Sequence, residues 1–294
     1  MLNLQAAEYL ATEPGTQIYL ENWTASEVSA AQPGFLLVHG GPGLYGYLGD
    51  FARSLGRNAP TWTYFQRGGA WSKSTGPMTV AAHILDLQKV LKRLSVEVRD
   101  LTVVGHSWGA LLAMLALKED SSLAKRVRLV GPMPFDFEGV KLFLANIDWR
   151  LTAEERRVRS ERMSGFATLT TPEARNELFN SLSDDIFKTY HFHPTFDRLS
   201  SKMDGTDADS FFASQGDLGR MMLESDLIQS LSGFTLPVEM IYGEYDPSPC
   251  LRLAAQLKAV LPYFSAQGLS ECGHYPWWEN DTVQKKFLAL IENK

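Results

Sequence analysis

The feature that most constrains this chain is the pentapeptide Gly105-His106-Ser107-Trp108-Gly109, which directly follows the apolar run Leu101-Thr102-Val103-Val104. This order predicts a strand, a very tight turn and then a helix that begins near Ala110. The turn would hold Ser107 in a strained backbone conformation, with its hydroxyl exposed at the tip of the strand. Glycine two residues before and after the serine fits such a turn, because a side chain there would collide with the neighbouring backbone. We therefore interpret Ser107 as a candidate nucleophile.

A serine hydroxyl is a poor nucleophile at neutral pH, so a base must take its proton. In this strand-to-helix arrangement the acid and then the histidine follow the serine along the chain. Of the six histidines, only His191, His193 and His274 follow Ser107. His274 comes directly after a glycine, in a loop that leads into the last predicted helix at 282–291. We expect His274 to be the base.

The acid should lie between the serine and the histidine, at the end of a strand. Residues 238–242 form a clear strand pattern, and Asp246 follows it just before Pro247. The residues between Asp246 and His274 leave room for a helix at 250–260, a strand at 263–267 and short loops, so both side chains can reach the same edge of a parallel sheet. Glu244 is the rival acid. We favour Asp246 because it lies beyond the strand, where the loop can turn inward.

A second glycine-rich segment follows the buried-strand run 34–38 and reads His39-Gly40-Gly41-Pro42-Gly43. Its backbone N–H groups can meet the N–H of Trp108, the residue after the nucleophile, and bind an oxygen that gains charge during acyl transfer. We predict Gly41 as the second donor. The alternative is a Gly/Pro turn without chemistry. His39 is better explained as a hydrogen-bonding residue at the strand end than as a second base.

With these segments in place, the chain resembles the α/β-hydrolase superfamily over nearly its full length. Within that superfamily it resembles the proline iminopeptidase (prolyl aminopeptidase) branch of serine peptidases. The resemblance implies an α/β-hydrolase fold, with a mostly parallel central sheet, helices on both faces and an inserted helical lid. It also implies a catalytic triad and an oxyanion hole. The triad residues would be Ser107, Asp246 and His274, and the oxyanion donors Gly41 and Trp108.

Two positions depart from the pattern of that branch. Phe65 stands before Gln66-Arg67-Gly68, where the branch usually has aspartate, and His106 replaces the middle glycine of the serine turn. Relatives that cleave an N-terminal proline carry lid glutamates that grip the free amino group. No motif in this chain matches those glutamates. The candidates for such a substrate-binding role are Glu138, Glu224 and Asp226.

Strand and helix patterns alternate along most of the chain, which predicts a parallel sheet covered on both faces. The alternation follows a hairpin at 6–23, stops at Gly131 and resumes at Leu236. The intervening segment has a helical pattern and many aromatic residues, as expected of a lid over the sheet edge that bears Ser107. We predict a catalytic core formed by residues 1–131 and 236–294, and a helical cap formed by residues 132–235.

Composition limits the other possibilities. The chain has 294 residues, 45% of them hydrophobic, which is enough to bury one large core. Its net charge of −6 argues against a nucleic-acid binder. No basic leader and no run of 18 apolar residues is present, so we expect no membrane partner and a cytoplasmic protein. Cys250 and Cys272 are expected as free thiols, although their pairing and the number of subunits stay open.

No cofactor is predicted. His191 and His193 could act as metal ligands, but a third ligand is not evident, so we predict no metal site. Three functions follow. The first is a serine hydrolase that forms an acyl-enzyme, with proline iminopeptidase-like aminopeptidase activity on short peptides or amino-acid amides. The second is a carboxylesterase, lactonase or amidase that acts on small molecules in an apolar pocket. The third is a hydrolase-fold protein that binds a ligand without turnover.

Overall fold

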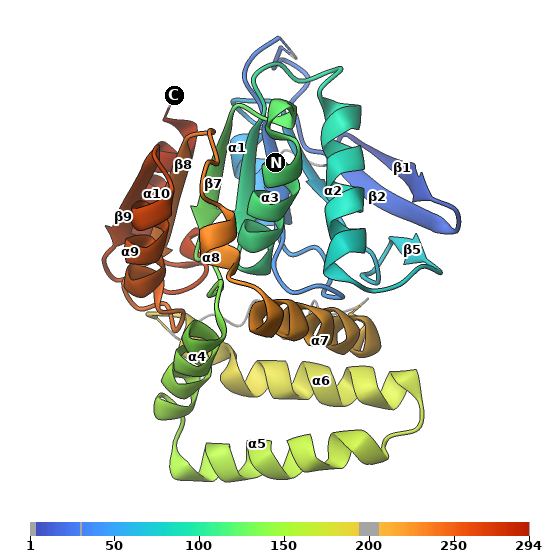
Figure 1. Cartoon of the computed structure of the whole chain (residues 1–294), viewed down its shortest axis with the longest axis vertical. Helices are drawn as coiled ribbons and strands as arrows, with labels where there is room; N and C mark the ends of the chain where they lie inside the picture. The colour runs from blue at the N-terminus through green and yellow to red at the C-terminus, as the bar shows by residue number, and fades with distance from the viewer. Residues whose placement is uncertain (1–3, 30, 194–205, 294) are drawn as a thin grey trace.

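A single mixed sheet forms the centre of the molecule (Figure 1), in a computed structural model that describes residues 4–29, 31–193 and 206–293. Within these residues the sheet has nine strands, in the order β1-β2-β4-β3-β6-β7-β8-β9, and β5 pairs with β2. The strands are β1 (Ala6–Glu13), β2 (Thr16–Asn22), β3 (Phe35–Val38), β4 (Thr61–Tyr64), β5 (Lys73–Ser74), β6 (Thr102–His106), β7 (Arg126–Val130), β8 (Val238–Gly243) and β9 (Phe264–Leu269).

The register of the sheet decides which loops lie together. Strand β2 is antiparallel to its neighbours, whereas β4, β3, β6, β7, β8 and β9 run parallel. Val38 pairs with Gly105, His106 with Val130, and Val130 with Ile241. The carboxyl ends of β3, β6, β7 and β8 therefore share one edge. Ligands bind outside the carboxyl ends of the strands in open α/β sheets, so this edge is where a site is expected.

Helices cover both faces of the sheet, as the strand–helix alternation predicts. On one face α2 (Val80–Leu94), α3 (Trp108–Glu119) and α9 (Cys250–Val260) contribute to one hydrophobic cluster. On the other face α1 (Gly49–Leu55) and α10 (Asp281–Glu292) contribute to a second cluster. Helix α2 begins after Thr79, whose side chain accepts a hydrogen bond from the N–H of Ala82. Such a cap pairs an N–H group that the helix itself leaves free.

Between β7 and β8 the chain forms a helical layer at the carboxyl edge of the sheet. In Figure 1, α7 lies next to the sheet, α6 lies beyond it and α5 is outermost. Helix α5 has no buried residue. The helices of this layer are α4 (Phe137–Trp149), α5 (Ala153–Gly165), α6 (Pro172–Phe187), α7 (Ala208–Glu224) and α8 (Leu227–Ser230). Residues 194–205 of this segment lie outside the described residues.

This arrangement confirms the predicted fold class, including the inserted helical lid. The division into a core and a separate cap at 132–235 stays a prediction. Near the end of that segment, Leu227, Leu231 and Phe234 belong to the hydrophobic cluster of the sheet. The remaining elements are short 3-10 turns, namely η1 (Ser121–Leu123), η2 (Phe166–Thr168), η3 (Lys188–Tyr190) and η4 (Pro276–Trp278).

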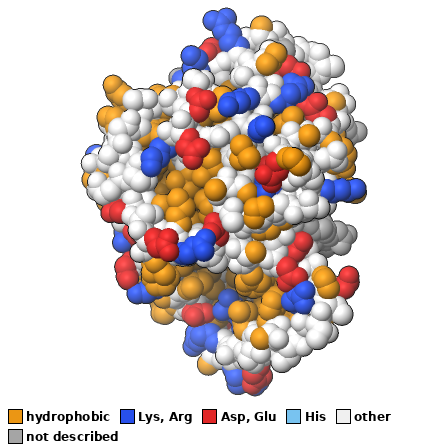
Figure 2. Space-filling model, turned by 45° about the vertical axis from the view of Figure 1, so that its right-hand side comes forward, with side chains coloured by type: hydrophobic (Ala, Val, Ile, Leu, Met, Phe, Trp, Pro, Cys, Tyr) orange, Lys and Arg blue, Asp and Glu red, His pale blue; other side chains and the backbone are white. Residues whose placement is uncertain are grey.

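The surface mixes residue types. Figure 2 shows hydrophobic side chains at the surface of both the upper and the lower half of the molecule, with positive and negative side chains interspersed among them. Within the part of the chain that the structure describes, no helix has the length and apolar character needed to cross a bilayer.

Candidate active site

The turn between β6 and α3 holds Ser107 in the conformation that the sequence pattern predicts. Ser107 has φ 53° and ψ −120°, in a region that residues other than glycine rarely occupy. A Cβ on Gly105 would lie 2.4 Å from the carbonyl oxygen of Gly109, and a Cβ on Gly109 would lie 2.2 Å from that of Val38. Both positions therefore require glycine, because the turn brings the backbone segments into direct contact.

Asp246 and His274 form a buried pair. Asp246 Oδ2 lies 2.8 Å from His274 Nδ1, and the two residues are 7% and 3% exposed. Asp246 Oδ1 accepts a hydrogen bond from the backbone N–H of Ser248 at 2.8 Å, which fixes the carboxylate in the loop after β8. The rival Glu244 is exposed and has no hydrogen bond or ion pair with His274. With Nδ1 directed at Asp246, Nε2 is the ring nitrogen that His274 can offer to a reacting group.

His106 does not serve as a second base, because both of its ring nitrogens already take part in hydrogen bonds. Tyr47 Oη accepts from the N–H of Gly40 at 2.7 Å and lies 2.5 Å from His106 Nδ1, and His106 Nε2 lies 2.9 Å from the carbonyl oxygen of His274. A carbonyl can only accept, so Nε2 carries the proton and Nδ1 accepts from Tyr47. Burial lowers the pKa of His106 well below its usual range, and the nearby His274 lowers it further. The neutral ring thus ties the Gly40 loop to the backbone of His274.

This chain of hydrogen bonds also decides which backbone groups are available in the loop after β3. The N–H of Gly40 is engaged by Tyr47, whereas the N–H groups of Gly41 and Trp108 have no hydrogen-bond partner among the described residues. Gln66 braces the same region. Its Nε2 donates to the carbonyl of His39 at 2.6 Å, and its Oε1 accepts from Trp108 Nε1 at 2.9 Å. The N–H groups of Gly41 and Trp108 are therefore available to donate to a bound group.

Ser107 and His274 border the same cavity, which has a volume of about 380 Å³. Its walls come from the loop after β3 and from the cap helices α4 and α7. Aside from the Ser107 hydroxyl, the His274 imidazole, the Gln215 amide and three tyrosines, its lining is apolar or glycine. The cap segment 132–235 contributes Met133, Pro134, Phe137, Val140, Phe143, Leu144, Tyr190, Phe211, Phe212, Gln215, Leu218, Gly219 and Met222.

The predicted amine-binding glutamates do not belong to this lining. Glu138 is exposed on α4 and forms an ion pair with Lys141 at 2.7 Å. Glu224 is exposed at the end of α7 and borders a separate surface pocket together with Asp226. Asp226 caps α8 by accepting from the N–H of Gln229. The structure therefore does not bring these carboxylates together with Ser107.

Gly131 is a site residue that the sequence analysis missed. It follows β7 with φ +46°, and a Cβ there would lie 2.9 Å from Asp246 Oδ2 and 3.2 Å from His274 Nδ1. In the sequence it marks only the end of a strand pattern. A glycine directly after the strand that neighbours the serine turn is the one signal that could have pointed to it.

Hydrogen bonds link the cap to the loop that carries His274. The N–H of His274 donates to the carbonyl of Tyr190 at 2.7 Å. The buried carboxylate of Glu279 accepts from the N–H groups of Gly273 and Phe192 at 2.9 and 3.0 Å. Burial raises the pKa of Glu279, but these N–H groups and the nearby His191 outweigh it, so its pKa lies below the usual value. The segment after α6 and the histidine loop thus share their anchors.

His191 lies against this carboxylate, with Nδ1 3.7 Å from Glu279 Oε1. In the described residues, no group of three or more His, Cys, Asp or Glu side chains is arranged to hold a metal ion. Cys250 and Cys272 are both buried and free. Burial raises the pKa of each thiol, so neither favours the reactive thiolate form.

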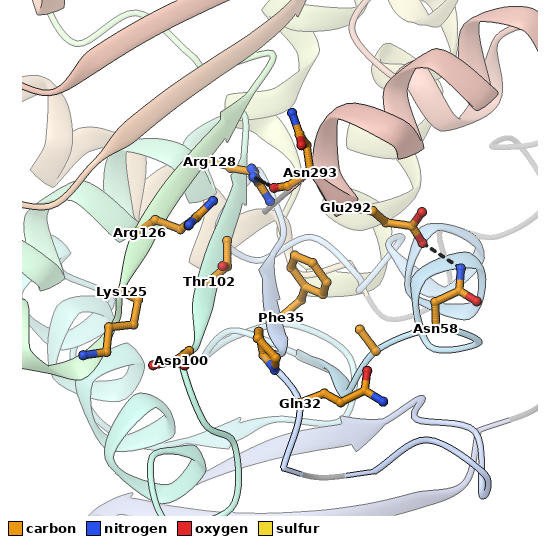
Figure 3. Close-up of a pocket in the computed structure, with 12 residues that line it drawn as sticks. Gln32, Phe35, Asn58, Asp100, Thr102, Lys125, Arg126, Arg128, Glu292 and Asn293 are labelled. Atoms are coloured by element: carbon orange, nitrogen blue, oxygen red, sulfur yellow. Dashed lines mark hydrogen bonds between the residues drawn. The ribbon is translucent and has the colours of Figure 1, made fainter.

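A larger cavity of about 700 Å³ lies at the opposite edge of the sheet, near the amino ends of β3, β6 and β7. Figure 3 shows Arg128 beside Asn293 and Asn58 beside Glu292 in this cavity. Arg128 donates to the carbonyls of Ile291 and Asn293, and Asn58 Nδ2 donates to Glu292 Oε1 at 2.8 Å. These contacts join the end of α10 to β7 and to the loop after α1, so Arg128, Asn58 and Glu292 have structural roles. The smaller cavity at Ser107 is the candidate active site.

Comparison with known proteins fits this geometry. Residues 35–284 match the family model described as the alpha/beta hydrolase family. The chain belongs to this family. No curated protein sequence matches the chain.

Solved structures of several alpha/beta hydrolases superpose on this family member. An esterase from Exiguobacterium antarcticum has a TM-score of 0.70 at 16% identity, with 97% of this chain and 98% of that chain covered. Proline iminopeptidase from Mycobacterium smegmatis has a TM-score of 0.68 at 17% identity, with 97% and 96% covered. A meta-cleavage product hydrolase from Pseudomonas fluorescens has a TM-score of 0.62 at 16% identity, with 98% and 96% covered. At these identities the likeness establishes the fold.

Proposed function

We propose that this alpha/beta hydrolase is a serine hydrolase that cleaves esters of neutral, apolar acyl groups through an acyl-enzyme at Ser107. The observation that carries the proposal is the character of the cavity beside Ser107 and His274. Among the described residues that line it, none is Asp, Glu, Lys or Arg. A charged substrate group would lose its water there without gaining a partner, which is costly. A neutral acyl group would instead bury apolar surface against the cap helices.

In this mechanism, Ser107 Oγ attacks the ester carbonyl carbon while its proton passes to His274 Nε2. Asp246 holds the other ring nitrogen through the 2.8 Å contact and stabilises the imidazolium that forms. The N–H groups of Gly41 and Trp108 donate to the carbonyl oxygen as it becomes negative. Each such donor lowers the barrier by about 2.7–4 kcal/mol. The alcohol leaves with the proton from His274. Water then attacks the acyl carbon, giving a proton to the same nitrogen. The bond between that carbon and Ser107 Oγ breaks, His274 returns the proton to Oγ, and the acid departs.

An aminopeptidase acting on an N-terminal proline is the second candidate. The His39-Gly40-Gly41-Pro42-Gly43 segment favours it, as does the similarity in fold to a proline iminopeptidase. A free ammonium group would need an acidic partner near Ser107, and Glu138 and Glu224 lie outside the cavity. The ester reaction therefore has the better support.

Activity-based labelling tests the proposed nucleophile. A fluorophosphonate probe should label the wild-type protein but not Ser107→Ala, and the exposed Ser225→Ala should label like wild type. Ester hydrolysis by Ser107→Ala should fall by about 10⁴-fold or more, because the acyl-enzyme cannot form. A wild-type protein that is not labelled and hydrolyses no substrate would support the binding-protein hypothesis instead.

A substrate panel separates the two enzymatic candidates. We expect turnover of p-nitrophenyl butyrate and little or none of L-proline p-nitroanilide. The reverse preference would overturn the ester proposal in favour of an aminopeptidase.

A further inference from the structure

The cap helix α7 presents one face to the cavity beside Ser107. The lining residues recur at the spacing of an α-helix, so they form one continuous stripe along it. That stripe consists of Phe211, Phe212, Gln215, Leu218, Gly219 and Met222. Facing residues of the cavity come from α4. In Figure 1, α7 lies between the sheet and α6, so the stripe is on the wall that closes the carboxyl edge.

The N-terminal end of α7 is fixed beside the proposed oxyanion loop, because the N–H of Asp207 donates to the carbonyl of Gly43 at 2.8 Å. From Phe211 to Met222 the lining residues extend about 16 Å along the helix, at a rise of about 1.5 Å per residue. The cavity of about 380 Å³ borders α7 over this length.

Gly219 stands out on this wall because no contact among the described residues requires a glycine there. Glycine is among the least favourable residues in a helix interior, since it gains the most freedom on unfolding. Counting the residues that the structure describes, a Cβ on Gly219 would have no heavy atom outside the local helix backbone within 4 Å, and the φ of Gly219 is not in the left-handed region. Close packing and turn geometry therefore do not explain it. What the missing side chain leaves open is space in the cavity.

Gly216 provides an internal comparison. It lies one turn earlier in the same helix, and a Cβ there would also have no described neighbour within 4 Å. Gly216 is exposed, however, and does not border the cavity. Both glycines lie in α7 and have space for a Cβ, but only Gly219 borders the cavity proposed to hold the substrate.

We propose that Gly219 sets the acyl-chain specificity of the enzyme by leaving room for the distal part of a medium-length or aryl acyl group. This inference rests on the proposed function of Ser107. The carboxyl carbon of the substrate would lie at Ser107, and the far end of its acyl group would lie against the open backbone of α7 at Gly219. The substrate class is then esters of neutral, extended acyl groups rather than acetyl esters.

Substitution of the two glycines by leucine tests the assignment through kcat/KM for p-nitrophenyl acetate and p-nitrophenyl octanoate. Gly219→Leu should lower the value for the octanoate by tenfold or more, because even one misplaced methylene in an apolar pocket changes selectivity by about 10–200-fold. The acetate value should stay within about threefold of wild type. Gly216→Leu should leave both values unchanged. An octanoate-to-acetate ratio that is the same in Gly219→Leu and wild type would overturn the proposal.

A binding measurement keeps this proposal separate from the proposed function. Methyl octanoate is titrated calorimetrically into Ser107→Ala, with and without the additional Gly219→Leu change, so no turnover is needed. Binding that weakens tenfold or more in the double variant supports the role of Gly219, even if the wild-type enzyme hydrolyses no ester. Equal binding of methyl octanoate by both variants, or no binding by either, contradicts it.

Discussion

Gly131 shows how a residue without a side chain can limit the proposed chemistry. Its backbone, at φ +46°, passes so close to the Asp246–His274 pair that a Cβ would enter contact distance of both side chains. Catalytic geometry tolerates little displacement, since a shift of about 1 Å can cost about 10²-fold in rate. The glycine thus protects the contact between the carboxylate and the imidazole.

Gly131→Ala should lower kcat/KM for the preferred ester by roughly tenfold to a hundredfold, because the new methyl group pushes Asp246 and His274 apart. Gly233→Ala is the matched control. Gly233 also has a positive φ, +85°, but a Cβ there would meet no atom of the described residues within 4 Å. Both variants should lose about 1–2 kcal/mol of unfolding free energy from the left-handed backbone. Equal activity of the two variants in steady-state assays would contradict the assigned role of Gly131.

The residues that sequence reasoning could predict are those whose local pattern dictates a conformation. Ser107 is recognised because its turn needs glycine on both sides, and Asp246 and His274 because each follows a strand at the expected place. Tyr47 and Gln66 act through contacts with residues that are distant along the chain. Their roles depend on the register of the sheet and the path of loops, which no local pattern specifies.

At the scale of elements, side chains of α7 form hydrogen bonds with helix α2 on the face of the sheet. Asp217 Oδ2 accepts from the N–H of Val80 at 2.8 Å, at the start of α2. Ser214 Oγ lies 3.0 Å from His83 Nε2, which points out from the same helix. A carboxylate at a helix N-terminus is stabilised by the helix dipole and by the free N–H groups there. The wall of the cavity and the first turn of α2 therefore support each other.

Asp217→Ala should destabilise the protein by about 1 kcal/mol, the usual cost of losing a side-chain partner at a helix N-terminus. Urea unfolding followed by circular dichroism measures the change. Arg220→Ala removes the ion pair that the largely exposed Arg220 makes with the same carboxylate but leaves the contact to Val80 intact. It should change stability by less than about 0.5 kcal/mol, as most exposed pairs do. A similar loss in both variants would mean that the ion pair, not the helix contact, matters.

Most elements of the sheet domain follow from hydrophobic runs and helical spacing. Helix α9 begins and ends at the residues predicted, and strand β3 begins one residue after the start of the predicted run 34–38. Helix α1 was not predicted because it has only seven residues and begins with a glycine. How α4 and α7 face each other across a cavity could not be predicted, since helical periodicity gives the face of a helix but not its partner.

At the scale of the whole molecule, the interior contains buried histidines that are neutral in the native state. Burial lowers the pKa of His39 to about 4 and, with help from the charge of Arg67, that of His83 to about 3. In the unfolded chain a histidine titrates near 6.5. Below that pH these histidines are protonated in the unfolded state but stay neutral in the native state. Stability is therefore unaffected by these groups above about pH 6.5 and falls as the pH drops toward their native pKa values.

The free energy of unfolding should accordingly be lower at pH 4.5 than at pH 7, and His83→Gln should lose less of it. The decrease should be smaller in this variant by about 2–3 kcal/mol, because pH 4.5 lies about two pH units below the pKa of the unfolded histidine and each unit contributes about 1.36 kcal/mol. Urea unfolding at the two pH values provides the measurement. His193→Gln, at an exposed position, should show the wild-type decrease. An unchanged decrease in His83→Gln would rule out this histidine as a source of acid sensitivity.

The shared anchors of the histidine loop and the segment after α6 bear on how this enzyme can be recombined with its relatives. Tyr190 receives a hydrogen bond from His274, and Glu279 joins Phe192 to Gly273. A chimaera joined at the ends of β7 and β8 would contain the cap of a relative. It would keep the partners at 273–279 but replace those at 190–192, so these hydrogen bonds would be lost. Exchange of residues 190–192 together with 273–279 would preserve these bonds. The boundaries of a functional chimaera should therefore lie in these loops and not at the ends of the strands.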